Sequence, residues 1–223
     1  MRPFVFVNVA ASLDGKISDE TRRQIRISSE EDLNRVDELR AKSDAIMVGI
    51  GTILSDDPSL TVKNEKLRAR RILLGLQENP VRVVVDSRCR IPLNARVLDQ
   101  RAKTIVAVSK IADKEKIEGV KKKAEVLVCG DEKVDLKCLL THLKEYGIKK
   151  LMVEGGGTLI NSLLAEGLVD EFYIYYAPVM IGGEKAPTIC DGKSFAEKIK
   201  FKIVSIEKFG DGFLVRAVPL VSR

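Results

Sequence analysis

The chain carries a series of short, continuous apolar runs, and these restrict its possible folds more than any other feature. They lie at residues 4–10, 45–49, 81–86, 104–109, 124–129 and 150–155. Strands that are buried on both faces have such runs, whereas strands with one solvent-exposed face alternate between apolar and polar residues. Helical patterns separate several of the runs, which favours parallel crossover connections. The sequence therefore predicts an α/β fold around a mostly parallel sheet flanked by helices.

The C-terminal third has a different pattern. Residues 170–182 are typical of a strand rich in aromatic side chains, and residues 200–209 and 213–221 are two further strand-like runs. Gly210, Asp211 and Gly212 join these two runs, and such a tight turn is typical of an antiparallel hairpin. No linker separates this part from the rest, so the sequence predicts a single domain over residues 1–223 with a mixed sheet.

The clearest helix is predicted over residues 28–43. Ser28 and Glu31 match a capping box, and acidic residues fill the first turn. Leu33, Val36 and Arg40 then fall on one face at helical spacing, which predicts that this face is turned inward. An arginine there either packs its aliphatic part at the edge of the core with its guanidinium in solvent, or points into a cleft that binds an anion. The spacing alone leaves both interpretations open.

Composition indicates an ordinary globular protein of 223 residues with a net charge of +6. No apolar run approaches the ~20 residues needed to span a membrane. The first residues continue directly into strand-like sequence without a convincing cleavage site, so a cytoplasmic location is expected. Basic clusters at residues 66–71 and 121–123 come without a recognition motif, so we expect no nucleic-acid partner.

The cysteines and the single histidine give no metal-binding spacing. Cys89, Cys129, Cys138 and Cys190 lie far apart, so we expect four free cysteines and no metal site. His142 lies in the helical stretch 135–147 and is expected to be peripheral, which disfavours histidine-dependent mechanisms. The inner stripe of that helix is predicted to be leucine, at Leu136, Leu139, Leu140 and Leu143.

A glycine-rich turn follows the strand-like run 150–155. The predicted strand ends at Glu154, glycines occupy residues 155–157, and a helix is predicted to begin near Thr158. Glycines let a backbone approach an anion closely, and a helix N-terminus attracts negative charge. The stretch matches neither the P-loop nor the Rossmann fingerprint. It predicts either an anion-binding turn or a purely structural one.

Two other strand ends carry polar residues. Gly49 and Gly51 precede Thr52, and a Ser-Asp-Asp-Pro stretch that includes Asp56 follows. Ser87 and Arg88 come directly after the strand-like run 81–86. In α/β sheets ligands gather at the carboxyl ends of the strands, and arginine suits a phosphate group. These segments are therefore candidates for one ligand-binding edge.

Asn8 interrupts the first apolar run. A buried asparagine is costly unless it is hydrogen-bonded, so Asn8 is expected either to tie down backbone or to face a ligand.

Four segments in this order resemble a known family. They are "NVAASLDGK", "LRAKSDAIMVGIGTILSDDPSLTV", "PVRVVVDSRCRIP" and "VEGGGTLINSLLAEGLVDEFYIYYAPVMIGG". Together they resemble the riboflavin-biosynthesis reductase family over roughly residues 4–218, and most closely its stand-alone archaeal and fungal form. The resemblance implies a dihydrofolate-reductase-like fold. The deaminase signature that bacterial relatives carry is absent, so only a reductase half is expected.

The resemblance also implies the activity, the cofactor and the site. The expected reaction is an NADPH-dependent reduction of a ribosylamino side chain, on a phosphorylated pyrimidine, to the ribitylamino form. Hydride would reach the sugar C1′ of the ring-opened imine, and a homodimer is expected. No general acid is assigned. The expected substrate-binding residues, with Asn8 added from its place in the strand, are Asn8, Arg40, Leu60, Lys63 and Glu154. The expected cofactor-binding residues are Ala10, Thr52, Asp56, Ser87, Arg88, Gly155, Gly156, Gly157, Thr158 and Leu159.

Two positions depart from the bacterial pattern. Arg26 stands where bacterial relatives usually have a tryptophan, and Lys63 stands where they have an arginine. Lys63 keeps the positive charge but loses the bidentate geometry of a guanidinium.

Two other functions remain open at this point. One is a folate reductase of the same fold, although Arg40 on the helix after the first strand suits a phosphorylated substrate better than the carboxylate that folate enzymes use there. The other is a non-catalytic nucleotide- or RNA-binding protein, which predicts salt-sensitive RNA binding without NADPH oxidation.

Overall fold

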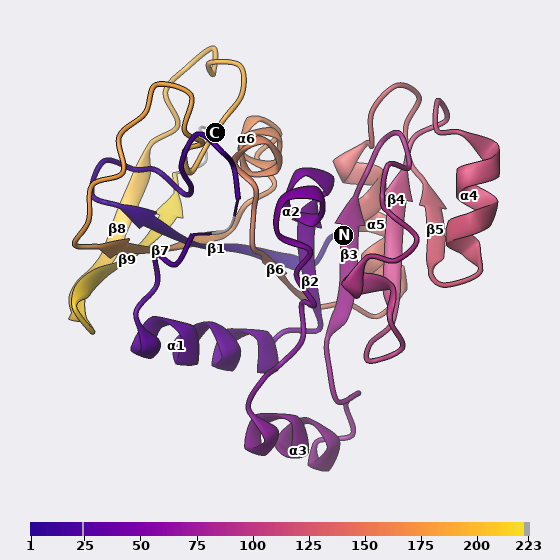
Figure 1. The fold of residues 1–223 in the computed structure, drawn as a ribbon, viewed down its shortest axis with the longest axis horizontal. Helices are drawn as coiled ribbons and strands as arrows, with labels where there is room; N and C mark the ends of the chain where they lie inside the picture. The colour runs from indigo at the N-terminus through magenta and orange to yellow at the C-terminus, as the bar shows by residue number, and fades with distance from the viewer. Residues whose placement is uncertain (24, 221–223) are drawn as a thin grey trace. The chain divides into compact units, whose positions relative to one another are not determined.

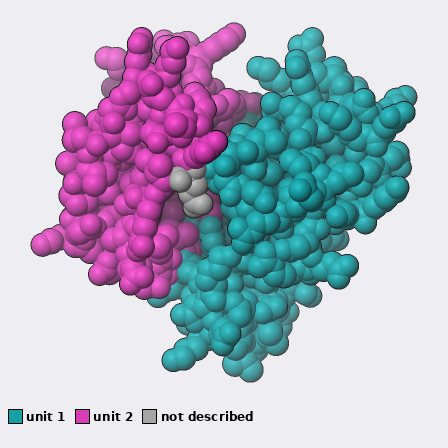
Figure 2. All heavy atoms as spheres, in the orientation of Figure 1, with its two compact units in different colours: residues 1–3, 37–152 teal, residues 4–36, 153–223 magenta. Residues whose placement is uncertain are grey.

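The computed structural model describes residues 1–23 and 25–220, and they fall into two compact units. Unit 1 consists of Met1–Pro3 and Asp37–Met152, and unit 2 consists of Phe4–Val36 and Val153–Arg223 (Figure 2). Each unit is therefore assembled from two separate stretches of chain. The single domain expected from the sequence stays a prediction.

Unit 1 is built on the parallel strands that the apolar runs predict. Its strand order is β5-β4-β3-β2-β6, and β2 with β3, β3 with β4, and β4 with β5 are parallel pairs (Figure 1). Every residue of β4 is buried, as expected for a strand covered on both faces. β5 forms one end of this order, and its Val128 is 52% exposed. The strands are β2 (Ala45–Gly49), β3 (Val81–Val85), β4 (Thr104–Val108), β5 (Glu125–Val128) and β6 (Lys150–Val153).

Three helices of unit 1 begin at a residue whose side chain caps them. Asn64, Asp113 and Asp135 each accept hydrogen bonds from the first backbone N–H groups of the helix that follows. The leucine stripe predicted for the helix after Asp135 is confirmed, because all four leucines are buried. The elements are α2 (Ile50–Asp56), α3 (Glu65–Leu73), the 3-10 helix η1 (Arg96–Leu98), α4 (Lys114–Lys121) and α5 (Leu136–Glu145). Among the described residues, no helix combines the length and the apolar character that crossing a membrane requires.

Unit 2 contains the antiparallel part of the fold. Its strand order is β1-β7-β9-β8, in which β1 and β7 are parallel while β7–β9 and β8–β9 are antiparallel. The predicted hairpin is confirmed, with Gly210 at a φ of 58° in its turn. The predicted last residue of the hairpin, Val221, lies outside the described residues. The elements are β1 (Phe4–Ser12), α6 (Gly157–Ala165), β7 (Glu171–Ala177), β8 (Phe201–Phe209) and β9 (Gly212–Pro219).

The helix predicted over residues 28–43 forms as α1 (Glu30–Ala41), but its start differs from the prediction. The Oγ atom of Ser29 accepts the backbone N–H of Asp32 at 3.2 Å. The capping box assigned to Ser28 and Glu31 is therefore wrong by one residue, and Ser29 is the cap.

The inner face predicted for α1 is also wrong. Leu33 is 47% exposed, whereas Asp32 and Asp37 are buried. Asp37 accepts the backbone N–H groups of Lys63 and Asn64, each at 2.7 Å. Because buried carboxylates are stable when they are fully hydrogen-bonded, these bonds set the orientation of the helix and override its apolar spacing.

Arg82 is a fully buried arginine in β3. Its Nη1 atom donates to Oδ1 of Asp99 at 2.8 Å, and its Nε atom donates to Oγ1 of Thr104 at 2.9 Å. Its Nη2 atom donates to the backbone carbonyls of Asp99 and Ala102. Arg101 reaches the same Asp99 carboxylate from an exposed position. Arg82 therefore ties β3 to the loop between η1 and β4 from inside the unit.

We expect Arg82→Leu to lower the free energy of unfolding by about 3–5 kcal/mol, because it leaves buried acceptors without a donor. Arg101→Leu is the matched control, since it removes an exposed guanidinium from the same carboxylate, and it should cost less than about 1 kcal/mol. Urea unfolding followed by circular dichroism measures both. Equal losses in the two variants would contradict the structural role assigned to Arg82.

Candidate functional site

The ends of β2 and β3 place two of the predicted polar segments at one edge of unit 1. Gly49 pairs with Val85 in the parallel register, so both strands end at the same level. α2 begins immediately at Ile50, so Thr52 lies inside its first turn and not in a glycine turn. Asp57 ends the helix in the left-handed conformation, with a φ of 40°. Thr52 is half-buried at this edge.

Leu60 was predicted to bind substrate, but its side chain is in the core. It is 2% exposed and its φ is 48°, in the left-handed region. The hydroxyl groups of its neighbours, Ser59 and Thr61, accept hydrogen bonds from Nζ of Lys63 at 2.5 and 3.1 Å. The backbone of Leu60 therefore places the hydroxyl groups of Ser59 and Thr61 around the lysine, while the Leu60 side chain packs in the core.

Positive charge is concentrated around Lys63 in unit 1. Burial of the amino group lowers the pKa of Lys63, and the neighbouring charges of Arg40, Arg101 and Arg96 lower it further. Arg40 also donates from Nη1 to the backbone carbonyl of Thr61 at 3.2 Å. Two predicted substrate residues, Arg40 and Lys63, are thus brought together. Arg96 and Arg101 were missed because nothing in their local sequence links them to this cluster.

Ser87 and Arg88 follow β3 as predicted, but they differ in their surroundings. The Oγ atom of Ser87 accepts the backbone N–H of Val134 at 3.0 Å, and its carbonyl accepts the hydroxyl of Ser109 at 2.8 Å. Ser87 therefore holds neighbouring loops together. Arg88 is exposed.

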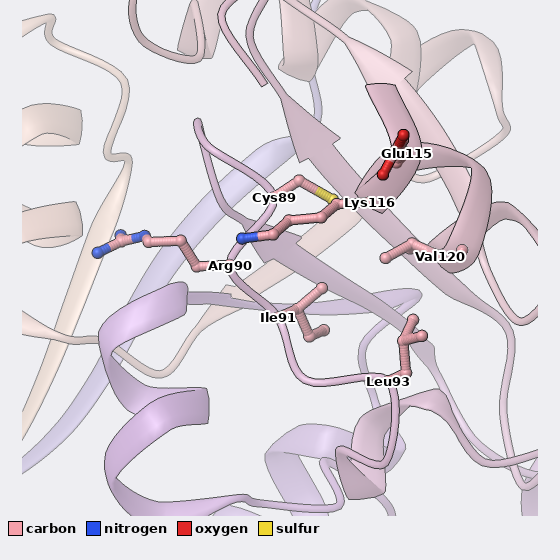
Figure 3. A pocket seen from close by; sticks show the side chains of 8 residues that line it. Cys89, Arg90, Ile91, Leu93, Glu115, Lys116 and Val120 are labelled. Atoms are coloured by element: carbon pink, nitrogen blue, oxygen red, sulfur yellow. The ribbon is translucent and has the colours of Figure 1, made fainter. Parts of the chain in front are cut away.

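A pocket lies next to these residues, within unit 1. Its volume is about 380 Å³, at the lower end of the range of roughly 300–1,000 Å³ that is typical of small-molecule sites. Figure 3 shows Ile91, Leu93 and Val120 on one side, with the Lys116 side chain extending past Cys89. The lining combines an apolar wall with cationic side chains, and consists of Cys89, Arg90, Ile91, Leu93, Glu115, Lys116, Gly119 and Val120.

The glycine turn in unit 2 has structural requirements at two of its three positions. Gly155 has a φ of 107°, which other residues rarely adopt. A Cβ atom on Gly157 would lie 2.5 Å from the backbone oxygen of Thr188, so packing alone requires glycine there. Gly156 is the N-cap of α6, and no side chain caps this helix. The first N–H groups of α6 are therefore offered without a side-chain acceptor, next to an exposed Thr158.

Asn8 is buried and hydrogen-bonded, and the partner of its side-chain oxygen is a side chain of α1. Its Oδ1 atom accepts a hydrogen bond from Nη2 of Arg35 at 2.8 Å, and Arg35 also donates to the buried carboxylate of Asp32. The Nη1 atom of Arg35 and the Oδ2 atom of Asp32 are buried without a hydrogen-bond partner. Sequence reasoning missed Arg35. Its spacing of three residues from Asp32, together with a polar residue inside an apolar strand, was the available signal.

The loop after β1 is held by Asp14. The carboxylate accepts the hydroxyl of Ser12 at 2.5 Å and the backbone N–H groups of Ile181 and Gly182 at 3.1 and 2.8 Å. The hydrogen bond from Ser12, followed by those from the two amides, lowers the pKa of Asp14 to about 2. The end of β1, where Ala10 is half-buried, is therefore attached to the segment after β7.

Four further residues that the sequence analysis named have the following positions. Glu154 directly follows β6 and is half-buried, while Leu159 is buried in the first turn of α6. Asp56 is the last residue of α2 and is half-buried. Arg26 is exposed, 4.0 Å from the Glu30 carboxylate.

A family model described as the RibD C-terminal domain matches residues 3–215. The chain belongs to this family. It is 62% identical, over 97% of its length and 98% of the relative's, to the 2,5-diamino-6-ribosylamino-4(3H)-pyrimidinone 5′-phosphate reductase of Archaeoglobus fulgidus.

Solved structures agree with the fold that the sequence implied. The RibD protein of Acinetobacter baumannii superposes with a TM-score of 0.78 at 28% identity, over 99% of this chain and 59% of that one. A dihydrofolate reductase from Enterococcus faecalis superposes with a TM-score of 0.50 at 14% identity, over 97% of this chain and 96% of that one. The second likeness concerns the fold alone, and the dihydrofolate-reductase-like architecture is confirmed.

Proposed function

We propose that this RibD C-terminal domain protein is an NADPH-dependent 2,5-diamino-6-ribosylamino-4(3H)-pyrimidinone 5′-phosphate reductase. The observation that carries the proposal is the cluster of Arg40, Lys63, Arg96 and Arg101 in unit 1, where partial burial and then the neighbouring positive charges lower the pKa of Lys63. A phosphate monoester relieves such repulsion, whereas a folate lacks that group at the reacting end. The name of the 62% identical relative supports the same substrate.

In the proposed reaction, the ribosylamino ring opens to an imine whose C1′ accepts a hydride and whose nitrogen accepts a proton. NADPH supplies the hydride. Arg40 and Lys63 hold the 5′-phosphate, and the hydroxyl groups of Ser59 and Thr61 keep the lysine amino group in place. The substrate contact of Leu60 is made through its main chain.

In unit 2, we assign Glu154 to hydrogen bonds from the amino groups of the pyrimidine or the hydroxyl groups of the sugar. Asn8 acts by orienting the Arg35 guanidinium, whose Nη2 atom donates a hydrogen bond to Oδ1 of Asn8 at 2.8 Å. Both roles are positioning roles, because holding the reacting carbon in a fixed geometry accounts for much of such a reaction's acceleration.

We assign the cofactor pyrophosphate to the turn from Gly155 to Leu159, including Gly156, Gly157 and Thr158. The uncapped start of α6 supports this assignment, because its free N–H groups and dipole favour an anion. Ala10, Thr52 and Asp56 are proposed as further cofactor contacts, by family position.

We assign the adenosine end of the cofactor to the pocket beside Arg90 and Lys116. Its apolar wall suits a flat base, and the cationic side chains suit a 2′-phosphate. Ser87 and the exposed Arg88 lie next to this pocket in the chain, and Arg88 is the proposed 2′-phosphate partner. This charge predicts a preference for NADPH over NADH.

The chain is further proposed to form a homodimer. β8 ends the strand order of unit 2 and exposes the apolar side chains of Ile203, Val204 and Ile206, which favours pairing with another copy. The cytoplasmic location expected from the sequence stays a prediction.

The reductase proposal is tested by incubating the folded chain with NADPH and the phosphorylated ribosylaminopyrimidine. Loss of the reduced-nicotinamide absorbance should accompany formation of the ribitylamino product, identified by mass spectrometry. Glu154→Gln should lower kcat/KM by about ten- to a hundredfold, the loss expected for a hydrogen bond to a charged group. Glu166→Gln, on the exposed end of α6, is the matched control.

No turnover of this substrate by folded protein would overturn the proposal. Turnover of dihydrofolate in its place would support the folate-reductase alternative. Full activity of Glu154→Gln would remove only the role assigned to that residue.

Arg88→Ala should reduce kcat/KM with NADPH by roughly ten- to a hundredfold, because a charge-assisted hydrogen bond to the 2′-phosphate is lost. The value with NADH should stay within about twofold, since NADH has no such phosphate. Arg70→Ala removes an equally exposed arginine from α3 and should leave both values unchanged. A parallel fall with both cofactors would rule out 2′-phosphate recognition by Arg88.

With increasing pH, KM for the phosphorylated substrate should begin to rise at a lower pH than it would if Lys63 had the usual lysine pKa. The folded-state pKa of Lys63 is lowered, so its ammonium is lost at a lower pH and its attraction for the phosphate goes with it. Lys63→Arg should keep KM constant through this range, because a guanidinium stays charged. Lys63→Met should raise KM about tenfold or more at neutral pH.

The control is Lys66→Met, which removes an exposed lysine three residues further along. A pH profile of KM that is the same in wild type and Lys63→Arg would show that another group titrates.

A further inference from the structure

Three potential metal ligands meet at the end of unit 1's edge strand. The sulfur atoms of Cys129 and Cys138 and a ring nitrogen of His142 all lie within 4.8 Å of one another. They come from a single stretch of chain, in which Cys129 follows β5 and the other two lie on α5. No residue proposed to bind substrate or cofactor belongs to this group.

The local fold holds this arrangement in two ways. Cys138 and His142 are four residues apart on α5, so their side chains leave the same face of the helix. The loop from Gly130 to Asp135 closes tightly, because a Cβ atom on Gly130 would lie 2.3 Å from the backbone oxygen of Lys133. The carbonyl of Cys129 accepts the backbone N–H of Asp135 at 3.1 Å, which fixes the cysteine beside the helix start.

The three side chains differ in their exposure to solvent. Cys129 is buried, Cys138 is half-buried, and the side chain of His142 is 47% exposed. An ion can therefore enter from the histidine side while the two sulfur atoms lie deeper.

The geometry suits a thiophilic ion. Zinc binds sulfur at about 2.3 Å and nitrogen at about 2.0 Å, which places tetrahedral ligand atoms roughly 3.5–3.8 Å apart. The three ligand atoms are within 4.8 Å of one another, so each separation needs to shorten by no more than about 1 Å to reach these values. Two sulfur ligands and one imidazole select zinc over magnesium or calcium, which prefer oxygen.

We propose that Cys129, Cys138 and His142 bind one zinc ion that fastens the end of β5 to α5. The fourth position is open to water or to Glu145, whose carboxylate lies 3.4 Å from Nδ1 of His142. When Nε2 binds the ion, Nδ1–H donates to this carboxylate, an arrangement that commonly orients metal-bound histidines. The site is structural, and it adds a ligand that stabilises the folded chain without taking part in the reduction.

The test uses the full chain, purified and kept reduced, with Co²⁺ as the spectroscopic probe. One Co²⁺ per chain should produce sulfur-to-metal charge-transfer absorption and the visible bands of tetrahedral coordination. Zn²⁺ should remove both signals by displacement, and it should raise the Tm of the chain. Cys138→Ser and His142→Ala should each bind Co²⁺ at least roughly tenfold more weakly and lose the Zn²⁺-dependent rise in Tm.

Cys190→Ser is the matched control, because Cys190 is a half-buried cysteine of unit 2 that accepts a hydrogen bond from Asn161. It should bind Co²⁺ like wild type. Circular dichroism checks that each variant is folded, and the half-buried and exposed positions of Cys138 and His142 make them the safer substitutions.

Absence of the charge-transfer absorption in the reduced wild-type chain would overturn the proposal, as would unchanged affinity in Cys138→Ser. After the reductant is removed, oxidation of Cys129 and Cys138 to a disulfide by dissolved oxygen at the same rate with and without Zn²⁺ would overturn it as well, because bound zinc protects its thiolate ligands from oxidation. None of these measurements depends on turnover, so the reductase proposal stands or falls separately.

Discussion

The in-register parallel pairing of β2 to β5 determines where unit 1 can place its chemistry. Gly49 lies opposite Val85, Val85 opposite Ala107, and Ala107 opposite Leu127, so these four strands end together. The two inner strands, β3 and β4, are covered on both faces, so polar side chains are largely confined to the segments that leave the strand ends. The helix that carries Thr52, the loop with Ser87 and the thiol of Cys129 all follow from that one register.

Asp99 links a buried structural arginine, Arg82, to the exposed Arg101 of the positively charged cluster around Lys63. Burial raises the pKa of Asp99, but hydrogen bonds from Arg101 and Arg82 outweigh it and bring the pKa to about 2. The carboxylate therefore stays ionised and neutralises the buried Arg82. Arg101, attached to the same carboxylate, contributes to the positive field around Lys63. The buried ion pair thus holds in place part of the cluster that is proposed to attract a phosphate.

The sequence predicts the parts of this fold that depend on periodicity. The apolar runs gave the strands and the leucine stripe gave α5, because burial of apolar side chains decides both. The prediction failed at α1, where hydrogen bonds from the backbone of Lys63 and Asn64 to Asp37 set the buried face and left Leu33 exposed. No local pattern expresses such long-range bonds.

The candidate sites show the same limit. Positions such as Glu154 and Thr158 came from the resemblance to a family, and the physics of the residues supports them without testing their roles. Arg96 and Arg101 joined the cluster around Lys63 through tertiary folding alone. Cys129 and His142 were interpreted as unrelated because they are twelve intervening residues apart, and local sequence does not reveal the loop that Gly130 closes.

The division of the chain into interleaved segments has a consequence for its synthesis. Unit 1 needs only residues up to Met152, but unit 2 combines Phe4–Val36 with Val153–Arg223. Val5, Phe6 and Val7 of β1 are fully or almost fully buried, and the parallel partner strand β7 follows only after residues 37–152 of unit 1. During synthesis β1 therefore emerges before its partner β7, and unit 1 can fold in the interval between them. The nascent chain therefore carries an apolar strand that stays without its parallel partner β7 while unit 1 is being made.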